Sequence, residues 1–199
     1  MVNVANVITI GRVFLALGTL GLLWLPGDNI RFVAFGLTAL VIYADALDGY
    51  FARKFNQASK FGGMLDIAGD RVVEMSYWIA FAALNWTPAW VALLFLVRGN
   101  FVDTIRSAAS ERGLTAFGEK TMMQSPLGKF LVASTFSRFT YAVAKAAAFC
   151  LLILAHTTVC LGTVVPASAD FLVYFSCVFC VVRGLPVLIE GRHLLTTGS

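Results

Sequence analysis

Charged residues are scarce in this sequence of 199 residues. Asp, Glu, Lys and Arg together make up only 13% of it, whereas soluble domains average about 25%. Apolar residues make up 59%, and the mean hydropathy is +0.81. One small soluble core cannot hide apolar runs of this length, and a membrane span needs only about 20 mostly apolar residues. The composition therefore excludes an ordinary soluble domain and indicates a membrane protein.

Features of redox, nucleic-acid-binding and secreted proteins are also lacking. No cluster of aromatic and basic residues suggests nucleic-acid binding. Cys177 and Cys180 lie inside the apolar run 171–182, where water and oxidants have poor access, so we interpret these thiols as buried spectators. Arg12 falls between short apolar stretches and no A-x-A-like site follows, so we expect no signal peptide.

What is present is a series of apolar segments separated by turn signals such as Pro26-Gly27. They predict an all-α, polytopic membrane protein with about six transmembrane helices. The expected helices cover residues 8–25, 30–53, 62–84, 88–112, 128–157 and 168–190. No shift in composition marks a second domain, so we expect residues 1–199 to form a single transmembrane domain.

The basic residues predict the orientation. Lys and Arg gather in segment 53–60 and around the loop within 106–129, whereas segments 85–88 and 156–170 contain neither. Arg31 alone lies near a helix end on the side of the latter two segments. Because cytoplasmic loops carry the excess of Lys and Arg, both chain ends and both basic loops are expected to be cytoplasmic.

Four aspartates of the chain gather in one short region. Asp45 and Asp48 are spaced i, i+3, and Asp66 and Asp70 are spaced i, i+4. Each pair therefore projects from one face of its helix. A short loop joins the two helices, so we expect antiparallel neighbours whose aspartate pairs face each other near the cytoplasmic end.

Four carboxylates at membrane depth need a counter-charge. Each costs about 2.5–3.5 kcal/mol at a helix centre, and like charges repel, so that at least one would protonate. Divalent cations remove both costs. Carboxylate oxygens suit Mg²⁺ or Mn²⁺, which also bridge phosphate oxygens. A site with two such ions could hold a diphosphate and polarise the transferred phosphorus.

The residues around the aspartates suit a nucleotide. Small residues, which let a ligand or backbone approach closely, stand at Gly49, Ala52, Gly62 and Gly63. The planar fork of Arg53 suits a phosphate. The alternative is that the aspartates pair with basic side chains at a wet helix end, namely those of Arg53, Lys54, Lys60 and Arg71. Spacing, glycines and membrane context together favour the metal site.

The chain resembles the CDP-alcohol phosphotransferases, also called CDP-alcohol phosphatidyltransferases. The full signature of that family is similar to the string Asp45-x2-Asp48-Gly49-x2-Ala52-Arg53-x8-Gly62-x3-Asp66-x3-Asp70. The N-terminal segment common in bacterial members is similar to Asn6-Val-Ile-Thr9-Ile-Gly-Arg12. The resemblance implies a six-helix fold, a homodimer, and a bacterial inner membrane with the active site facing the cytoplasm.

The resemblance also implies roles for single residues. Asp45, Asp48 and Asp66 would be metal ligands. Asp70 would be the base that deprotonates the acceptor hydroxyl, and would also lie near a metal; base, ligand or both remain open. The CDP part of the donor would contact Gly49, Ala52, Arg53, Gly62, Asn6 and Thr9. The products would be CMP and a new phosphodiester.

The acceptor is indicated by arginines inside the apolar segments, at Arg98, Arg106, Arg138 and Arg183. Such residues usually face the bundle interior or a water-filled cavity, and several of them together would suit a phosphate. The alternative is that they pair with Asp103, with Glu74 or with the aspartate cluster, or extend to the membrane interface.

Two stretches resemble the phosphatidylglycerophosphate synthases of that family, 98–113 and Pro126-Leu-Gly128-Lys129. Where those enzymes tend to continue with a second lysine and a threonine, this chain has Phe130-Leu-Val-Ala, and Asp103 also departs. The resemblance implies CDP-diacylglycerol as donor and glycerol-3-phosphate as acceptor, with inositol phosphate, inositol or another small alcohol as alternatives. A membrane transporter also places charges in a bundle, but gives no reason for the aspartate-glycine spacing.

Overall fold

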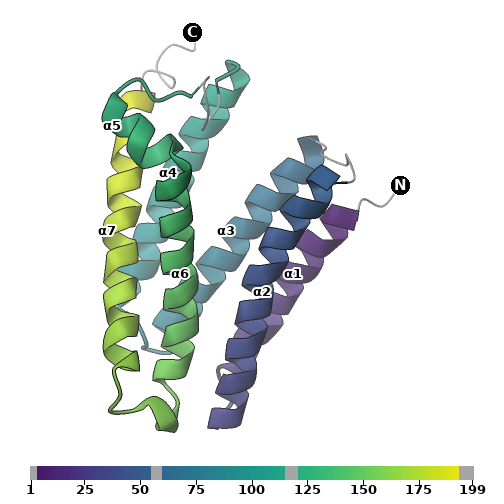
Figure 1. Cartoon of the computed structure of the whole chain (residues 1–199), viewed down its shortest axis with the longest axis vertical. Coiled ribbons are helices and arrows are strands. Elements are labelled where there is room, and N and C mark those ends of the chain that lie inside the picture. Colours follow the sequence, from purple (N-terminus) through teal and green to yellow (C-terminus); the bar gives the residue numbers. More distant parts are fainter. Residues whose placement is uncertain (1–3, 55–59, 115–120, 193–199) are drawn as a thin grey trace. The chain divides into compact units, whose positions relative to one another are not determined.

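The structure is a computed structural model that describes the backbone of residues 4–54, 60–114 and 121–192, and the side chains of 6–45, 61–114 and 121–192. Within these ranges the elements are α1 (Val4–Leu22), α2 (Asp28–Lys54), α3 (Lys60–Ala83), α4 (Ala89–Glu111), α5 (Pro126–Gly128), the π-helix η1 (Lys129–Ala133), α6 (Thr135–Ala155), the 3₁₀-helix η2 (Thr158–Cys160) and α7 (Val165–Gly191) (Figure 1). The prediction of an all-α protein is confirmed.

Six of these helices are long. Five of them coincide with expected segments to within a few residues, and α6 lies within the expected segment 128–157. By length and apolar composition, two helices in the described ranges qualify as membrane spans, Thr135–Ala155 and Val165–Gly191. Large apolar side chains also point outward on the long helices: Phe14 is 71% exposed, Phe136 72% and Phe171 66%. Apolar surface of this extent suits contact with lipid.

The expected continuous helix over 128–157 is wrong, because the chain is interrupted at Ser134. That residue is extended (φ −66°, ψ 140°) between η1 and α6. Its hydroxyl accepts a hydrogen bond from the Ser137 amide (3.2 Å), and the Ser137 hydroxyl donates to the Leu131 carbonyl (2.6 Å). These bonds satisfy backbone groups locally, and so compete with a continuous helical ladder. A serine-rich segment that sequence periodicity assigns to one helix thus divides into two.

The chain folds into two compact units. Unit 1 comprises Met1–Ala92 and Ala146–Asp170, and unit 2 comprises Leu93–Lys145 and Phe171–Ser199. In unit 1, α1 packs against both α2 and α3. The core of unit 1 includes aromatic rings of α3 around Phe149: Tyr77 stacks on Phe149 with centroids 4.8 Å apart, and Trp78 meets it edge-on at 4.9 Å.

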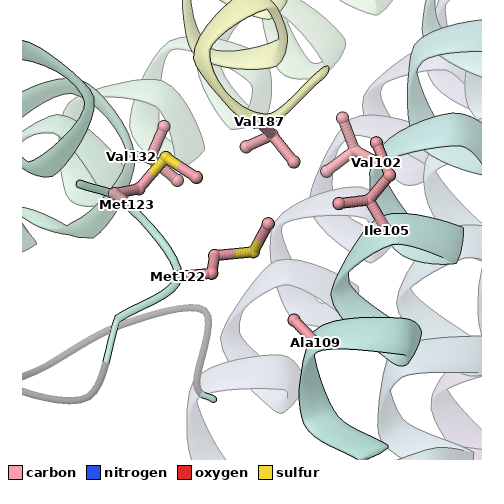
Figure 2. Close-up of a cluster of buried hydrophobic side chains, with 7 residues drawn as sticks. All are labelled: Val102, Ile105, Ala109, Met122, Met123, Val132 and Val187. Carbon is pink, nitrogen blue, oxygen red and sulfur yellow. The ribbon is translucent and has the colours of Figure 1, made fainter. Parts of the chain in front are cut away.

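Unit 2 has its own apolar core, drawn in Figure 2. Its buried side chains come from α4, η1, α7 and the segment before α5, and they are Val102, Ile105, Ala109, Met122, Met123, Val132 and Val187. Two glycines of α7 let α4 approach. A Cβ added at Gly184 would lie 3.0 Å from Arg98 Cγ, and one added at Gly191 would lie 2.3 Å from Ile105 Cγ2. These two contacts fix α4 and α7 as parallel neighbours within unit 2.

The four cysteines are free thiols in the structure. Cys177 and Cys180 are buried, and Cys150 and Cys160 are half-buried. Burial inside an apolar helix gives the first two no access to oxidant. The interpretation of these two thiols as spectators therefore agrees with their positions.

A carboxylate links the start of α2 to η2 in unit 1. Asp28, the first residue of α2, accepts hydrogen bonds from the amide (2.9 Å) and the hydroxyl of Thr158. These bonds, the hydroxyl bond first, lower the pKa of Asp28. A lowered pKa in the folded state stabilises the protein fully above the ordinary Asp pKa of about 4, and this contribution is lost as the pH falls through the lowered value.

We therefore expect Thr158→Val to lower the thermal midpoint at pH 7, on the order of 2 °C. The difference from wild type should shrink as the pH falls through the lowered pKa of Asp28. Thr163→Val is the control, because the Thr163 hydroxyl donates to the Cys160 carbonyl (2.6 Å), which does not titrate. Thermal melts of the three proteins between pH 7 and pH 3 check this. An equal Thr158→Val effect at both pH values would contradict the assignment.

Candidate functional site

Three aspartates from two helices meet in unit 1. One carboxylate oxygen from each of Asp45, Asp66 and Asp70 lies within 4.8 Å of the others. Their side chains are about half exposed, at 48%, 46% and 51%. The structure thus brings together three of the four aspartates of the signature. The side chain of Asp48 lies outside the described residues, as do the predicted nucleotide contacts at Gly49, Ala52 and Arg53.

One buried hydrogen bond aligns the two helices that carry these carboxylates. The hydroxyls of Thr38 on α2 and Tyr77 on α3 are 2.9 Å apart in the buried core. Asp45 follows Thr38 by seven residues, and Asp70 precedes Tyr77 by seven. Seven residues are two helical turns, so each aspartate lies on the same face as its hydroxyl partner. Because the helices are antiparallel, the pairing of Thr38 with Tyr77 brings Asp45 opposite Asp70.

Arg12 of α1 joins the three carboxylates. Its Nη1 donates to Asp45, and its Nη2 donates to Asp70 (2.8 Å) and lies 3.5 Å from Asp66. The Arg12 side chain is only 3% exposed. The carboxylates therefore meet a buried guanidinium on one side and remain accessible on the other.

The sequence interpretation assigned Arg12 no role. A signal was nevertheless present, because Arg12 is the only charged residue in α1. An ionisable residue inside an apolar helix marks a functional site by default. What the sequence could not show is the partner, since Arg12 is 33 residues from Asp45 and 58 from Asp70.

Gly69 lets α1 come close enough for this contact. A Cβ added at Gly69 would lie 3.0 Å from Thr9 Cγ2, 3.4 Å from Val13 Cγ2 and 3.7 Å from Arg12 Nη2. Thr9, a predicted nucleotide contact, is buried in this contact between the helices. Asn6 is half-buried almost one turn earlier on α1.

The residues present fit a divalent cation. Three carboxylates and one guanidinium carry charges of −3 and +1, which leaves −2 at the cluster. Half-exposed carboxylate oxygens are the ligands that hard cations such as Mg²⁺ and Mn²⁺ prefer. Gly62, the remaining predicted nucleotide contact, is half-buried one turn before Asp66. An ion bound here would therefore lie beside a residue that leaves room for a ligand.

A group of cations surrounds one ring in unit 2. The guanidinium carbons of Arg98 and Arg183 lie 5.8 and 5.5 Å from the ring centroid of Tyr141, and the Lys145 ammonium lies 4.4 Å from it. Arg98 and Arg138 are both close enough to Arg183 to act on it electrostatically. Within the described part of the chain, no carboxylate pairs with Arg98 or Arg183. This surplus of positive charge suits an anionic ligand.

The buried Arg183 also stabilises the interrupted helix. Its Nη1 donates to the Ser137 hydroxyl (2.6 Å), and its Nη2 lies 3.4 Å from the Val132 carbonyl. Both partners belong to the segment around Ser134, where backbone groups lack helical partners. Arg183 therefore connects α7 to the break between η1 and α6.

The other predicted acceptor contacts differ in their surroundings. Arg106 Nη1 lies 4.0 Å from Asp103 Oδ1 on α4. This distance is at the upper limit for an ion pair, so the alternative of pairing with Asp103 applies to Arg106. Arg138 is exposed. Glu74, another partner considered for these arginines, accepts a hydrogen bond from Arg71 (2.7 Å). The structure thus brings Arg98, Arg138 and Arg183 near one another, and leaves Arg106 beside an acid.

Glu190 is a residue that the sequence interpretation missed. It accepts hydrogen bonds from the amides of Gln124 (2.7 Å) and Ser125 (3.2 Å) and from the Ser125 hydroxyl. It thereby holds the turn that leads into Pro126-Leu-Gly128-Lys129. A Cβ added at Gly128 would lie 2.5 Å from Glu190 Oε1. No local signal could have shown this pairing, because 65 residues separate Glu190 from Ser125.

Comparison with known proteins finds one family model and several relatives that match this chain. The family model described as CDP-alcohol phosphatidyltransferase matches residues 2–182. A probable phosphatidylglycerophosphate synthase of Mycobacterium tuberculosis is 31% identical over 115 residues, which cover 56% of this chain and 55% of that protein. The CDP-diacylglycerol–glycerol-3-phosphate 3-phosphatidyltransferase of Bacillus subtilis is 28% identical over 125 residues, 57% of this chain and 65% of that protein.

A different acceptor appears among the relatives. The CDP-diacylglycerol–inositol 3-phosphatidyltransferase of Candida albicans is 41% identical over 56 residues, which cover 27% of this chain and 24% of that protein. The matched part of the chain spans about half the length of the first curated relatives.

The close contact at Gly69 generates a test. We expect Gly69→Ala to lower stability by about 1–3 kcal/mol, because the new methyl group overpacks the contact with Thr9. Gly63→Ala is the matched control on α3, since a Cβ there meets nothing within 4 Å and alanine favours a helix. Thermal melts of both variants in detergent check this. If Gly69→Ala were as stable as Gly63→Ala, the close approach of α1 would not be required.

Proposed function

Because this chain belongs to the CDP-alcohol phosphatidyltransferase family of metal-dependent membrane enzymes, we propose that it transfers a phosphatidyl group from CDP-diacylglycerol to a small alcohol and releases CMP. The observation that carries this proposal is the convergence of Asp45, Asp66 and Asp70, whose carboxylate oxygens lie within 4.8 Å of one another. These are three of the four aspartates in the signature of the family.

The aspartates would hold two divalent ions, Mg²⁺ or Mn²⁺. Asp45, Asp48 and Asp66 are the proposed ligands, with Asp70 close to the same ions. The bound ions would neutralise the phosphate oxygens of the donor and make its phosphorus more electrophilic. The chain itself contributes the placement: α1 packs against both α2 and α3, and the Thr38–Tyr77 bond aligns the latter two, so that the carboxylates already stand together.

Asp70 is the proposed base. Its side chain is 51% exposed, the most accessible of the three, and its carboxylate would accept the proton of the acceptor hydroxyl. The hydroxyl oxygen would then form a bond to the donor phosphorus, and the bond from that phosphorus to CMP would break. Asp70 could accept this proton while it remains close to the proposed metal ligands.

The nucleotide would lie along the aspartate signature. The proposed contacts are Gly49, Ala52, Arg53, Gly62, Asn6 and Thr9. Gly62 is half-buried at the start of α3, and Asn6 is half-buried at the start of α1. The small residues among them, Gly49, Ala52 and Gly62, would leave room for cytidine and its diphosphate.

The acceptor is proposed to carry a phosphate, with glycerol-3-phosphate the leading candidate. The name of the matched B. subtilis relative includes glycerol-3-phosphate, and that of the M. tuberculosis relative is probable phosphatidylglycerophosphate synthase. Arg98, Arg138 and Arg183 would bind the phosphate, with Arg106 as a further contact. In support, Arg98 and Arg183 have no carboxylate partner in the described ranges, and guanidinium forks bind phosphate with charge-assisted bonds. Inositol phosphate, inositol or another small alcohol is the alternative.

The membrane setting and assembly complete the proposal. The excess of Lys and Arg in the loops around 53–60 and 106–129 favours a cytoplasmic active site. The family resemblance implies a bacterial inner membrane. Membrane lipid would cover the exposed apolar side chains. A homodimer is expected from the family resemblance.

The metal requirement can be measured as CMP release. With CDP-diacylglycerol and glycerol-3-phosphate, we expect EDTA to abolish turnover and Mg²⁺ or Mn²⁺ to restore it. Asp66→Asn should lower turnover at least about 100-fold, because the site loses a ligand charge. Asp70→Asn should lower turnover while largely retaining donor binding. The control is Asp28→Asn, which changes a carboxylate outside the cluster. Full turnover after exhaustive chelation would contradict the metal site.

The acceptor can be tested with a panel of alcohols and one arginine. We expect Arg98→Gln to raise the acceptor KM roughly tenfold or more, because a hydrogen bond to a charged group contributes about 1.5–3 kcal/mol. The donor KM should change little, and Arg98→Lys should retain part of the affinity. Faster turnover with free inositol, serine or choline than with any phosphorylated acceptor would contradict the phosphate assignment.

A further inference from the structure

Arg12 is part of the aspartate cluster, although the signature does not include it. It bonds one oxygen of each carboxylate, the Oδ1 atoms of Asp45, Asp66 and Asp70. These are the same three residues whose oxygens stand close enough to hold a metal ion. A guanidinium and a divalent ion would therefore act on one set of carboxylates.

The electrostatic consequence depends on burial. The Arg12 side chain is 3% exposed, so it is not free to extend into water when another cation arrives. Its bonds to the carboxylates hold it in place, and the absence of a side chain at Gly69 leaves space beside it. Two cations that share carboxylates repel each other. Conversely, three carboxylates this close would repel each other without any cation.

We propose that Arg12 is the built-in counter-ion of the metal-free site and that it competes with the divalent cation for Asp45, Asp66 and Asp70. In the absence of metal, Arg12 keeps the carboxylates together. When metal is bound, the nearby positive charge of Arg12 lowers the affinity for it. The inference rests on the proposed metal site, and it adds a residue that sets how tightly that site holds its ions.

A merely structural ion pair predicts the opposite sign for metal binding. If Arg12 only held α1 against α2 and α3, its loss would separate the carboxylates and weaken the binding of metal. If Arg12 competes with the metal, its loss removes a positive charge and strengthens the binding. Metal affinity measured without substrate therefore separates the two roles.

The experiment uses the purified full chain in detergent, as wild type, Arg12→Gln, Arg12→Lys and Arg31→Gln. Arg31 is the matched control, because it lies 3.6 Å from Asp28 and about 20 Å along α2 from Asp45. Two quantities are measured without donor or acceptor. They are the thermal midpoint in excess EDTA and the dissociation constant of Mn²⁺, followed by electron paramagnetic resonance.

We expect Arg12→Gln to lower the thermal midpoint in EDTA on the order of 5 °C and to tighten Mn²⁺ binding roughly tenfold. Saturating Mn²⁺ should then recover most of the lost stability. Arg12→Lys should keep the Mn²⁺ affinity near that of wild type, because it keeps the charge. Its midpoint in EDTA should be intermediate, because an ammonium lacks the planar fork. Arg31→Gln should leave the Mn²⁺ affinity unchanged.

Unchanged or weaker Mn²⁺ binding by Arg12→Gln would overturn the inference. Combined with metal-dependent CMP release by wild type, that result would leave the proposed function standing, whereas no Mn²⁺ binding by wild type would overturn both. If Arg12→Gln can be purified only with Mn²⁺, the release of Mn²⁺ after addition of EDTA replaces the titration. Slower release than from wild type is then expected, and equal or faster release would overturn the inference.

Discussion

The need to neutralise carboxylates in an apolar chain is the constraint on which this structure depends. Three aspartates stand within 4.8 Å of one another in a protein with only 13% charged residues. A buried arginine meets them from α1, and their outer sides remain half exposed. Charge left over after this pairing is negative and accessible. The cluster is therefore both stable enough to form and suited to bind a cation.

The helices of unit 1 are arranged so that this neutralisation can occur. The Thr38–Tyr77 bond sets the register of α2 and α3, and two turns farther along each helix the aspartates come face to face. Gly69 then admits α1 closely enough for Arg12 to reach all three carboxylates. The Tyr77 ring also stacks on Phe149, which fixes the position of α3 two turns from Asp70. A polar site thus follows from apolar packing and one buried hydrogen bond.

In the described part of unit 2, the charge without a counter-ion is positive. Arg183 is buried against a hydroxyl, a carbonyl and an aromatic ring, and within the described ranges no carboxylate neutralises it or Arg98. Dipoles and ring faces stabilise a cation only in part. The guanidinium groups of Arg98 and Arg183 can therefore still bind an anion. The break at Ser134 supplies the hydroxyl and carbonyl that Arg183 uses, and Glu190 holds the turn before η1. Departures from regular helix therefore occur where the charged side chains are placed.

The sequence by itself determined the long helices and the aspartate pairs, because both depend on local periodicity. Apolar runs place the six long helices, and spacings of three and four residues place each aspartate pair on one helix face. Tertiary structure alone decided the partners of those aspartates, the division at Ser134 and the role of Glu190. Arg12 lies 33 to 58 residues from its carboxylates, and Glu190 lies 65 residues from Ser125. Such pairings depend on which helix faces pack together. Here the close contacts at Gly69 and Gly128 and the Thr38–Tyr77 bond decide the packing. The helix propensity of a single segment does not contain this information.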